Sequence, residues 1–569
     1  MPTLHWIGKE KVVSHHQDVP YKILNHTYGF TEKGEQKTET KSGNKIIKGD
    51  NLLALKALLP EYEGKIKCIY IDPPYNTGKE SWVYNDNVNH PKIKKWLGEV
   101  VGKDGEDLTR HDKWLCMMYP RLKLLHKLLA EDGVIFVSID ENEVHNLRLM
   151  LNDIFGSNNF IEQLVWNKRV PKNDKGIGNI HEYVLLYSKE NLKSHRFTQL
   201  KEGLDSVFDL VSKHKRKKTK ILEVKSDLQK LFKKNGYDRG ITLYNNLDAN
   251  YDLFGKINLS WPNGQTNGPR FDIFHPITKK PCNVPDRGWR WKKETFDSYL
   301  DYDNVEKLAD GSYKCGKIWF AKDENTQPSS IKYLYEVKDF LLRSIISLKS
   351  SGSIDLEAIF EKGKFDYPKP VNLLELLLNS FDDKDALILD SFAGSGTTAH
   401  AVLNLNKADE GSRKFILIEM EDYAEEVTSE RIKRVINGYG KDKKEVEGTG
   451  GAFDFYELGK PIFKDNENLN EEVGEDKIRN YIYYTETKQP LTRQQSKEGK
   501  YLLDNYQDTG YYFYYEKDSL TTLDNNSLGI ISELQEQYII YADICLLDEA
   551  YMLNKNIIFK KIPRDIKRF

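Results

Sequence analysis

The chain has 569 residues, more than a single hydrophobic core normally supports, so roughly two to four domains are expected. Hydrophobic residues make up 39% of the sequence, which is enough for packed cores, and 85 basic residues nearly balance 87 acidic ones. The formal net charge of -2 excludes a strongly basic protein, so any surface for nucleic acid must be local.

The cysteines indicate a reducing compartment. There are five of them, no two stand at metal-ligand spacing, and an odd number cannot all pair internally: Cys68, Cys116, Cys282, Cys315 and Cys545. We therefore expect a cytoplasmic chain with no metal site. The N-terminal stretch MPTLHWIGKEKVV lacks the apolar core of a signal peptide, and no apolar run approaches the roughly 20 residues of a membrane span.

The first elements in chain order alternate between helix and strand. Residues 51–62 carry leucines at helical spacing, and residues 65–71 (KIKCIYI) are typical of a buried strand. Residues 76–112 are polar and rich in Gly and Asn, which predicts a long loop. An amphipathic helix is predicted over 113–133, with Gly133 placed to end it.

The alternation continues over residues 134–188. The pattern predicts a strand at 134–140 that ends in an acid, a helix at 145–156 and a strand at 182–188. Strands that alternate with helices favour a parallel α/β sheet.

The pattern changes at about residue 189, where charge density rises and aromatic residues lie among basic ones. The alternation returns near residue 370 with a helix at 371–381, a strand at 386–390, a glycine turn leading into a helix, and a strand at 414–420. We therefore expect one α/β domain that is divided by an insertion. The expected boundaries are 1–189 and 366–450 for the two parts of that domain, 190–365 for the insertion and 451–569 for a C-terminal domain.

A glycine-rich turn, DSFAGSGTT (390–398), connects a predicted strand to a predicted helix. Such a turn lets the backbone approach a ligand closely, and the helix N-terminus offers free N–H groups. A phosphate-binding loop needs a lysine before its Ser or Thr, but Gly396 is followed directly by Thr397. The turn therefore favours a small adenosyl ligand over a phosphate. A tight turn without a ligand is the alternative interpretation.

Glu419 supports the adenosyl interpretation because it ends the next predicted strand. A carboxylate at that position can hydrogen-bond both ribose hydroxyls, as in nucleoside-binding α/β folds. Glu421 and Asp422 are rival candidates for the same role, and a solvated strand-end acid is the alternative.

A second corner, Asp72-Pro73-Pro74-Tyr75, follows the strand at 65–71. In α/β sheets, ligands gather outside the C-terminal ends of strands. The prolines lack N–H groups and fix the chain, so their carbonyls are expected to point into a cavity. An acid, a bare carbonyl and an aromatic ring suit an amino group on a planar heterocycle. A proline-stiffened turn is the alternative for the two prolines alone.

Together these motifs, Asp-Pro-Pro-Tyr and Phe-x-Gly-Ser-Gly-Thr-Thr, resemble the signature pair of amino-group DNA methyltransferases that use S-adenosylmethionine (SAM). The order, with Asp-Pro-Pro-Tyr first and an insertion between the motifs, is similar to the β class. Further segments resemble the modification (Mod) subunit of type III restriction-modification systems: 111–122, 133–143, 154–161, 181–189 and 557–566. The resemblance covers most of the chain except 190–330.

The resemblance implies a SAM-dependent, Rossmann-like α/β fold with a mostly parallel sheet, an inserted α+β target-recognition domain and a C-terminal α+β region. It implies a catalytic corner formed by Asp72, Pro73, Pro74 and Tyr75. It assigns cofactor binding to Asp390, Phe392, Gly394, Ser395, Gly396, Thr397, Glu419, Asp50 and Lys369. For Asp50 and Lys369, a solvated acid and a surface lysine are the alternatives.

The activity implied by the resemblance is methyl transfer from SAM to the N6 amino group of an adenine flipped out of duplex DNA. Aspartate rather than serine at position 72 favours adenine over cytosine N4. The family also implies a homodimer and association with an ATP-dependent restriction (Res) subunit. Cytosine-N4 or RNA methylation, a solitary methyltransferase, and a DNA-binding scaffold with an inactive SAM fold are the alternatives.

The insertion is expected to read the DNA. Residues 212–220 (SKHKRKKTK) form a dense basic run, and residues 287–293 (RGWRWKK) place arginine beside tryptophan. Basic side chains neutralise phosphates, and arginine can pair with guanine. A solvated helix face is the alternative for 212–220, and Trp289 and Trp291 are more often core residues than contacts.

Overall fold

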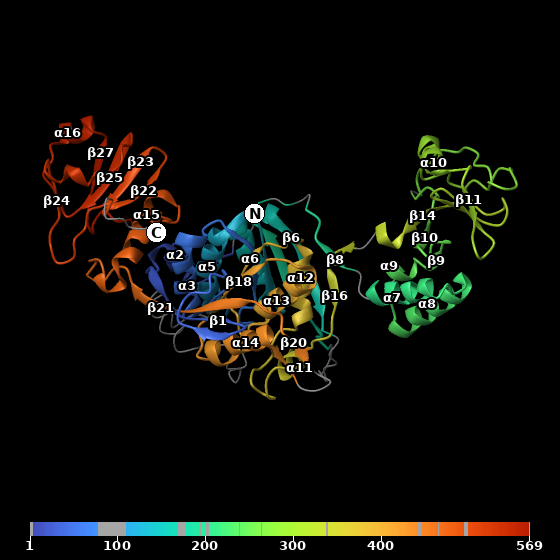
Figure 1. Ribbon diagram of the computed structural model, residues 1–569, viewed down its shortest axis with the longest axis horizontal. Helices are drawn as coiled ribbons and strands as arrows, with labels where there is room; N and C mark the ends of the chain where they lie inside the picture. The colour runs from blue at the N-terminus through green and yellow to red at the C-terminus, as the bar shows by residue number, and fades with distance from the viewer. Residues whose placement is uncertain are drawn as a thin grey trace. The chain divides into compact units, whose positions relative to one another are not determined.

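The structure is a computed structural model in which the chain divides into two compact units. Unit 1 comprises Met1–Arg196 and Arg343–Phe569, and unit 2 comprises Phe197–Leu342 (Figure 1). The residues that the structure describes are 4–77, 110–168, 178–190, 192, 195–200, 204–237, 239–262, 264–336, 339–440, 445–464, 466–493 and 499–567. Most of the loop predicted at 76–112 therefore lies outside the described residues.

Unit 1 is built on one eleven-stranded sheet. Its strands are, in spatial order, β16 (Ile345–Ser347), β6 (Phe160–Asn167), β7 (His181–Ser188), β5 (Leu129–Ile139), β4 (Ile66–Ile71), β17 (Leu387–Asp390), β18 (Lys414–Glu419), β3 (Lys45–Lys48), β21 (Ala452–Pro461), β1 (Lys22–Thr31) and β2 (Gly34–Gln36). The strands from β5 to β21 run parallel to one another, and β7 and β1 run antiparallel to their neighbours. The mostly parallel α/β sheet predicted from the sequence is confirmed.

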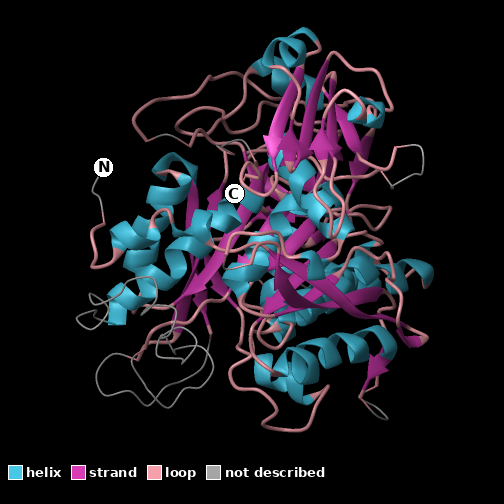
Figure 2. Cartoon of the chain, turned by 90° about the vertical axis from the view of Figure 1, so that its left-hand side faces the viewer, coloured by secondary structure: helices cyan, strands magenta, loops and turns pink. Residues whose placement is uncertain are grey.

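The helices of the chain are drawn in cyan in Figure 2. In unit 1, the helices that precede the C-terminal lobe form two sets, one on each side of unit 2 in the sequence. The first set is α1 (Lys9–Val12), α2 (His15–Asp18), α3 (Asn51–Tyr62), α5 (Arg110–Leu128) and α6 (Val144–Phe155). The second set is α11 (Gly352–Glu357), α12 (Val371–Ser380), α13 (Thr397–Asp409) and α14 (Glu430–Asn437). A short ladder, β19 (Gly438–Tyr439) with β20 (Val446–Glu447), follows α14.

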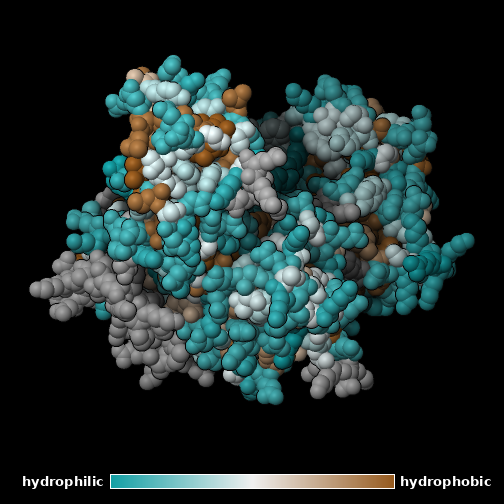
Figure 3. Space-filling model, turned by 60° about the vertical axis from the view of Figure 1, so that its left-hand side comes forward, coloured by the Kyte–Doolittle hydropathy of each residue, from teal (hydrophilic) through white to brown (hydrophobic). Residues whose placement is uncertain are grey.

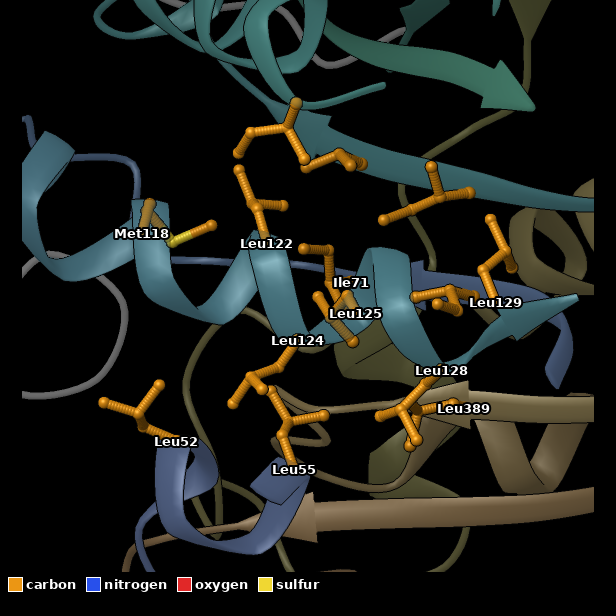
Figure 4. Packing of buried hydrophobic residues seen from close by; sticks show 14 of the residues in the cluster. Leu52, Leu55, Ile71, Met118, Leu122, Leu124, Leu125, Leu128, Leu129 and Leu389 are labelled. Atoms are coloured by element: carbon orange, nitrogen blue, oxygen red, sulfur yellow. The ribbon is translucent and has the colours of Figure 1, made fainter. Parts of the chain in front are cut away.

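The sheet is buried on both faces, which explains its uninterrupted apolar strands. On β4, Ile69 and Ile71 belong to the cluster that includes the leucines of α3 and α5, while the alternate residues Cys68 and Tyr70 are also buried. Figure 4 shows leucines of α5, among them Leu122 and Leu125, packed beside strand residues such as Ile71.

One predicted boundary is wrong. Helix α5 ends at Leu128 and β5 begins at Leu129, so Gly133 lies within a strand and does not end the helix. The pairing of β5 with β4 shifts register between Leu129 and Val134, which marks a bulge at this point. A Cβ at position 133 would lie 2.9 Å from the Ile66 carbonyl oxygen, so the bulge requires glycine.

The structure also places two predicted boundaries differently. Strand β16 lies within the stretch predicted as insertion, 190–365, yet it pairs with β6 at the edge of the large sheet. Strand β21 lies within the predicted C-terminal domain, 451–569, yet it pairs with β3 and β1 in the same sheet. Strand β16 is the edge strand of the sheet and β21 lies between β3 and β1, and the alternating α/β pattern of the sequence carries no signal for either.

Beyond β21, unit 1 continues into a C-terminal lobe. Its elements are α15 (Glu475–Thr487), β22 (Leu502–Tyr506), β23 (Thr509–Phe513), β24 (Thr522–Leu523), β25 (Gln537–Ala542), β26 (Ile544–Cys545), α16 (Glu549–Asn554) and β27 (Ile557–Lys561). Tyr484 on α15 donates a hydrogen bond to Glu63, which ties the lobe to α3. Several large hydrophobic side chains of this lobe are exposed, including Leu520, Leu546 and Leu553. Figure 3 shows one face of the molecule, on which brown hydrophobic areas lie among hydrophilic residues.

Unit 2 combines helices with a six-stranded antiparallel sheet, in the order β11-β12-β13-β14-β10-β9. Its elements are β8 (Thr198–Leu200), α7 (Leu204–Arg216), α8 (Ile221–Asn235), α9 (Arg239–Thr242), β9 (Asn246–Leu247), β10 (Leu253–Asn258), α10 (Lys293–Tyr299), β11 (Val305–Lys307), β12 (Tyr313–Cys315), β13 (Ile318–Phe320), β14 (Ser329–Tyr333) and β15 (Asp339–Leu341). Strands β8 and β15 pair with each other, so the first and last strands of the unit are joined.

Within the described ranges, no helix has the length and apolar content to cross a bilayer. In the same ranges, no three His, Cys, Asp or Glu side chains gather in a way that could hold a metal ion.

Candidate active site

The two sequence motifs meet at the C-terminal ends of two central strands of the large sheet. Strands β4 and β17 are parallel neighbours, with Leu389 opposite Ile69, so both end on the same side. Asp72 follows β4 and Asp390 is the last residue of β17. These two segments are more than 300 residues apart in the sequence, and only the strand order brings them together.

A pocket lies between these two strand ends. It is lined by Asp72 and Tyr70 from the β4 side, by Lys369 and the residues just before it, and by Asp390 with the glycine turn. The predicted cofactor residues that line it are Asp390, Phe392, Gly394, Ser395, Thr397 and Lys369. The structure therefore brings one predicted catalytic residue and most predicted cofactor residues around a single space.

Asp72 is held in a buried cluster of charges. Lys369 Nζ lies 2.9 Å from Asp72 Oδ2 and 3.4 Å from Glu182 Oε2, while Lys168 Nζ lies 2.6 Å from Glu182 Oε1. Two carboxylates thus share two ammonium groups, which balances the charge of a site that is almost closed to solvent. We call Asp72, Tyr75, Lys168, Glu182 and Lys369 the charge cluster.

Burial and ion pairing act in opposite directions on the pKa values of this cluster. Burial raises the pKa of Asp72 above its ordinary value, although the Lys369 ammonium opposes the shift. Burial also disfavours the Glu182 carboxylate, but the two lysines bring its pKa below the ordinary value. The pKa of Lys369 is raised by both acids in spite of its burial. The lysine is therefore charged, and it favours the ionised form of Asp72.

One carboxylate oxygen of Asp72 has no hydrogen-bond partner among the described residues. Oδ2 accepts from Lys369, whereas the unpaired oxygen is Oδ1, which is buried. Buried carboxylate oxygens are normally paired, because an unpaired acceptor loses its hydration without compensation. The unpaired oxygen lies on a residue that lines the pocket, so it is available to a donor that enters there.

The rest of Asp72-Pro73-Pro74-Tyr75 is fixed by its neighbours. The Pro74 carbonyl accepts a 2.6 Å hydrogen bond from Trp114 Nε1, so it does not point into the cavity as expected. The Tyr75 hydroxyl donates to Glu182 Oε2 at 3.0 Å and accepts from Lys369 Nζ at 2.7 Å. Lys369 Nζ also lies 4.7 Å from the centre of the Tyr75 ring, within cation–π range.

The glycine turn takes the conformation that its glycines permit. Gly394 and Gly396 have φ values of 52° and 79°, a region that other residues rarely adopt. Helix α13 begins at Thr397, directly after the turn. The Thr428 hydroxyl donates to the Gly394 carbonyl oxygen at 2.6 Å, which anchors the turn to the segment before α14.

Two buried acids flank the turn, and each is held by hydrogen bonds. Asp390 accepts from the Phe392 N–H at 3.0 Å and from the Thr398 hydroxyl at 2.5 Å. Glu419 accepts from the backbone N–H groups of Gly394 and Met420, both at 2.8 Å. Burial is the largest influence on both, and it raises the pKa of Asp390 to about 7 and that of Glu419 to about 8.

The structure distinguishes Glu419 from its rivals. The Glu419 side chain is buried and bound to the glycine turn, whereas the Asp422 side chain is fully exposed and pairs with Lys48. Glu421 presents its backbone N–H to Glu419 at 3.1 Å. Of the three acids, Glu419 is therefore the one whose side chain is hydrogen-bonded to the glycine turn.

Asp50 lies on the same side of the sheet but outside the pocket lining. Its side chain caps α3 by accepting from the Leu53 N–H at 3.1 Å, and Arg121 Nη2 lies 3.6 Å from its other oxygen. The neighbouring Gly49 N–H donates to the Glu419 carbonyl oxygen at 2.9 Å. These contacts place Asp50 beside the β18 end and give it a helix-capping role.

Sequence reasoning missed several residues of this site. The predicted strand at 182–188 includes Glu182, but no role was predicted for Glu182, Lys168 or Arg431. Glu182 had a detectable signal, because an acid inside a largely apolar strand is unusual unless it is paired. Lys168 and Arg431 carry no comparable signal, since lysines and arginines are common on helix and strand ends.

Unit 2 has a second pocket whose wall combines basic and aromatic side chains. Trp291 and Tyr299 stack with their ring centres 5.0 Å apart, and Arg290, Lys317 and Lys332 line the same pocket. Lys317 is paired with Glu336 at 2.7 Å. Trp289, by contrast, is a core residue with no exposed surface, as its type predicted.

The chain matches the model of the N6_N4_Mtase family, described as DNA methylase, over residues 66–430. It is 32% identical over 457 residues to the type III restriction-modification enzyme EcoP15I Mod subunit of Escherichia coli, covering 77% of this chain and 66% of that one. It is 30% identical over 440 residues to the EcoPI Mod subunit of Escherichia phage P1, covering 74% and 64%. It is 30% identical over 405 residues to the type II methyltransferase M.KpnI of Klebsiella pneumoniae, covering 70% and 85%. The chain thus spans about two thirds of the length of these two Mod subunits.

Proposed function

The chain belongs to the N6_N4_Mtase family of DNA methylases, and we propose that it methylates the N6 amino group of adenine in duplex DNA as a type III Mod subunit. The proposed methyl donor is SAM. One observation carries the proposal: Asp72 keeps a buried, unpaired acceptor oxygen, as judged from the described residues, and lines the same pocket as the glycine turn. A hydrogen-bond donor on the substrate can pair with that oxygen, and a ligand can bind against the turn.

The residues around the glycine turn fit SAM. Gly394 lines the pocket and has no side chain of its own, so a ligand can approach its backbone closely. Asp390 and Glu419 place two acids beside the turn, and SAM offers an ammonium group, ribose hydroxyls and a sulfonium as their partners. When bound, SAM supplies an electrophilic methyl group carried on the sulfonium.

Asp72 and Pro73 are the proposed acceptors for the target amine. An exocyclic amine on adenine is a poor nucleophile because its lone pair is delocalised into the ring. Hydrogen bonds from its two N–H groups to Asp72 Oδ1 and to the Pro73 carbonyl draw the nitrogen toward tetrahedral geometry. Because the Pro74 carbonyl already accepts a hydrogen bond from Trp114, the Pro73 carbonyl is the proline acceptor that remains at this corner. Placement and electrostatics carry the step, and no covalent enzyme intermediate is required.

Tyr75 is the proposed stacking surface for the base. The target base must leave the duplex to reach the pocket, at a cost of a few kcal/mol. Stacking on an aromatic ring returns about 1–3 kcal/mol per base. The Tyr75 hydroxyl donates a hydrogen bond to Glu182 and accepts one from Lys369, so the orientation of the ring is set before the base arrives.

Unit 2 is the proposed DNA-reading part. The run at 212–220 includes the end of α7 and carries exposed basic side chains, and the pocket of Trp291 and Tyr299 carries three more basic residues. Basic side chains neutralise phosphates, and aromatic rings can stack on bases. Replacing Lys317 or Lys332 by Ala should weaken DNA binding and lower the dependence of affinity on salt.

We also propose a homodimer, a Res partner and a cytoplasmic location. The exposed leucines of the C-terminal lobe, among them Leu520, Leu546 and Leu553, support a partner surface there. The five free cysteines fit a reducing compartment. Sedimentation of the chain alone tests the dimer, and a shift on addition of a Res subunit tests that partner.

Transfer of tritium from methyl-labelled SAM to unmethylated plasmid DNA tests the activity. Digestion of the product should place the label in N6-methyladenine. The Asp72→Ala protein should bind SAM but transfer no label. Label in cytosine or in RNA would replace the proposal by one of those activities. Binding of SAM and DNA without any transfer by the wild-type chain would make it a scaffold.

A further inference from the structure

Arg431 lies beneath the glycine turn and is completely buried. It stands in the first half of α14, and its guanidinium has no exposed surface. Its Nη1 atom donates to Ser395 Oγ at 2.8 Å and to Thr397 Oγ1 at 2.9 Å. Both hydroxyls belong to residues that line the pocket, so the arginine touches the pocket wall from behind.

The charge of Arg431 is not paired. Its other hydrogen bonds go to the Ser395 carbonyl oxygen and to His400 Nδ1, both neutral acceptors. Among the described residues, no carboxylate lies within ion-pair distance of it. The nearest influential acid, Asp355, is bound to Ser351 and to the Val371 N–H.

Another buried arginine of the same domain shows the usual arrangement. Arg413 is as buried as Arg431, but it forms a two-pronged pair with Asp409, at 3.0 and 2.9 Å. Asp409 ends α13, about 18 Å along the helix from the glycine turn. Because buried charges are normally paired, an unpaired arginine directly behind a ligand pocket indicates that its counter-charge arrives with the ligand.

The hydrogen bonds also set the direction of the two hydroxyls. Arg431 donates into the oxygen of each, so their own hydrogens must point elsewhere. The Thr397 hydrogen is directed to the Lys369 carbonyl oxygen at 3.3 Å. The Ser395 hydroxyl lies 3.3 Å from the Thr397 hydroxyl oxygen, a long hydrogen-bond distance, so its hydrogen can turn to a better acceptor in the pocket.

We propose that Arg431 is a positioning residue for the carboxylate at the amino-acid end of SAM. It gives the glycine-turn wall of the pocket a positive charge and orients the Ser395 hydroxyl as a donor toward that carboxylate. The proposal rests on the proposed function, because it takes SAM as the ligand. Arg431 is then the residue that makes the protein bind a ligand with this carboxylate more tightly than the same ligand without it.

Calorimetry with two ligands tests the proposal. SAM and decarboxylated SAM differ only in the carboxylate, so each protein is titrated with both. Wild-type protein should bind SAM the more tightly. In Arg431→Gln, SAM should lose roughly tenfold in affinity while decarboxylated SAM changes by less than about threefold. Arg431→Lys, which keeps the charge, should recover part of the preference.

Two further variants keep the test decisive if Arg431→Gln does not fold. Ser395→Ala leaves the arginine in place but removes the hydroxyl through which it acts, and it should lose the preference for SAM in part. Arg413→Gln removes a buried arginine that has its own acid partner, and it should destabilise the protein without changing the ratio of the two affinities.

Three results would overturn the inference. They are equal affinity of wild-type protein for both ligands, equal loss of both ligands in Arg431→Gln, and an unchanged ratio in Ser395→Ala. Failure of wild-type protein to bind either ligand is a different outcome, because it contradicts the proposed function itself.

Discussion

The catalytic corner and the glycine turn lie at the ends of neighbouring strands, yet they hold their charged groups in different ways. At the catalytic corner, Asp72 and Glu182 are paired with Lys369 and Lys168. At the glycine turn, the acids are bound by backbone N–H groups and a hydroxyl, and the one buried arginine is bound by neutral oxygen and nitrogen atoms.

This difference separates two tasks. Ion pairs keep an acid charged inside the protein, which suits a residue whose negative charge must face a donor. Hydrogen bonds to neutral groups instead hold a charged or titratable side chain in place without pairing it with an opposite charge. A charged ligand can supply that opposite charge. The two corners therefore respond differently when a charge is removed.

The largest effect is expected at Asp72. Asp72→Asn keeps the size of the side chain but replaces the negative acceptor by an amide, so the rate of methyl transfer should fall about 10³-fold. SAM affinity, measured by calorimetry, should stay within about threefold because the glycine turn is untouched. A comparable loss of SAM affinity in Asp72→Asn would contradict this division, because it would show that Asp72 also contributes to SAM binding.

Lys369→Met should give the next largest effect, together with a change in pH dependence. Burial raises the pKa of Asp72 and the Lys369 ammonium opposes this, so removing the ammonium raises that pKa further. The proposed mechanism uses ionised Asp72, so on acidification the variant should lose activity at a higher pH than the wild type does. The acid limb of the pH–rate profile should move up by about one unit.

Lys168→Met is the matched control for this substitution. It removes the other lysine of the charge cluster, which contacts Glu182 and not Asp72. Its acid limb should move by less than about half a unit. Identical profiles for the two variants would contradict a specific role of Lys369 in keeping Asp72 charged.

Asp390→Asn probes the glycine-turn side and should have a smaller effect on activity, with about tenfold weaker SAM binding. Its clearest effect is on stability. Burial raises the pKa of Asp390 from 3.8 to about 7, so the folded protein keeps a proton that the unfolded chain releases between these values. Wild-type stability should therefore fall as pH rises through this window.

The asparagine variant lacks this titration. Without ligand at pH 8 it should be more stable than wild type by roughly 1–3 kcal/mol, and at pH 4 the advantage should disappear. Urea unfolding at the two pH values measures the difference. A pH-independent difference would mean that Asp390 is ionised in the ligand-free protein throughout.

Tyr75→Phe should have the smallest effect. It keeps the ring and removes only the hydroxyl that contacts Glu182 and Lys369, so we expect a loss of about threefold in rate. Tyr75→Ala also removes the stacking surface and should cost about 1–3 kcal/mol in base binding. A fluorescent adenine analogue at the target position reports the position of the base. Equal losses in both variants would place the role of Tyr75 in its hydroxyl.

Much of the fold was predictable because the chain alternates clearly between helix and strand. The ends of β4 and β17 carry Asp72 and Asp390 directly after apolar runs, so both strand ends could be located. The adjacency of β4 and β17 could not be read from periodicity, because strand order depends on long-range packing. Gly133 was misread because a glycine after a helical pattern signals a helix end as readily as a bulge.

The site was predictable where it rests on motifs and unpredictable where it rests on isolated charged residues. Asp-Pro-Pro-Tyr and the glycine turn are continuous in sequence. Glu182 and Arg431 are single residues of β7 and α14, and Lys168 directly follows β6, so none of the three belongs to a continuous motif. The Pro74 carbonyl was expected to face the cavity, and only the position of Trp114 shows that it is engaged elsewhere.

Strands β8 and β15 have a consequence for how the chain can change. They pair Thr198–Leu200 with Asp339–Leu341, and the Leu342 N–H then bonds to the Phe197 carbonyl oxygen at 2.8 Å. The two ends of unit 2 are therefore adjacent, because the first and last strands of the unit pair with each other. Replacing the residues between β8 and β15 with another domain preserves the spacing of the two attachment points. If unit 2 reads DNA as proposed, a new sequence preference can arise by replacement of the whole unit, without any change to the residues at the ends of β4 and β17.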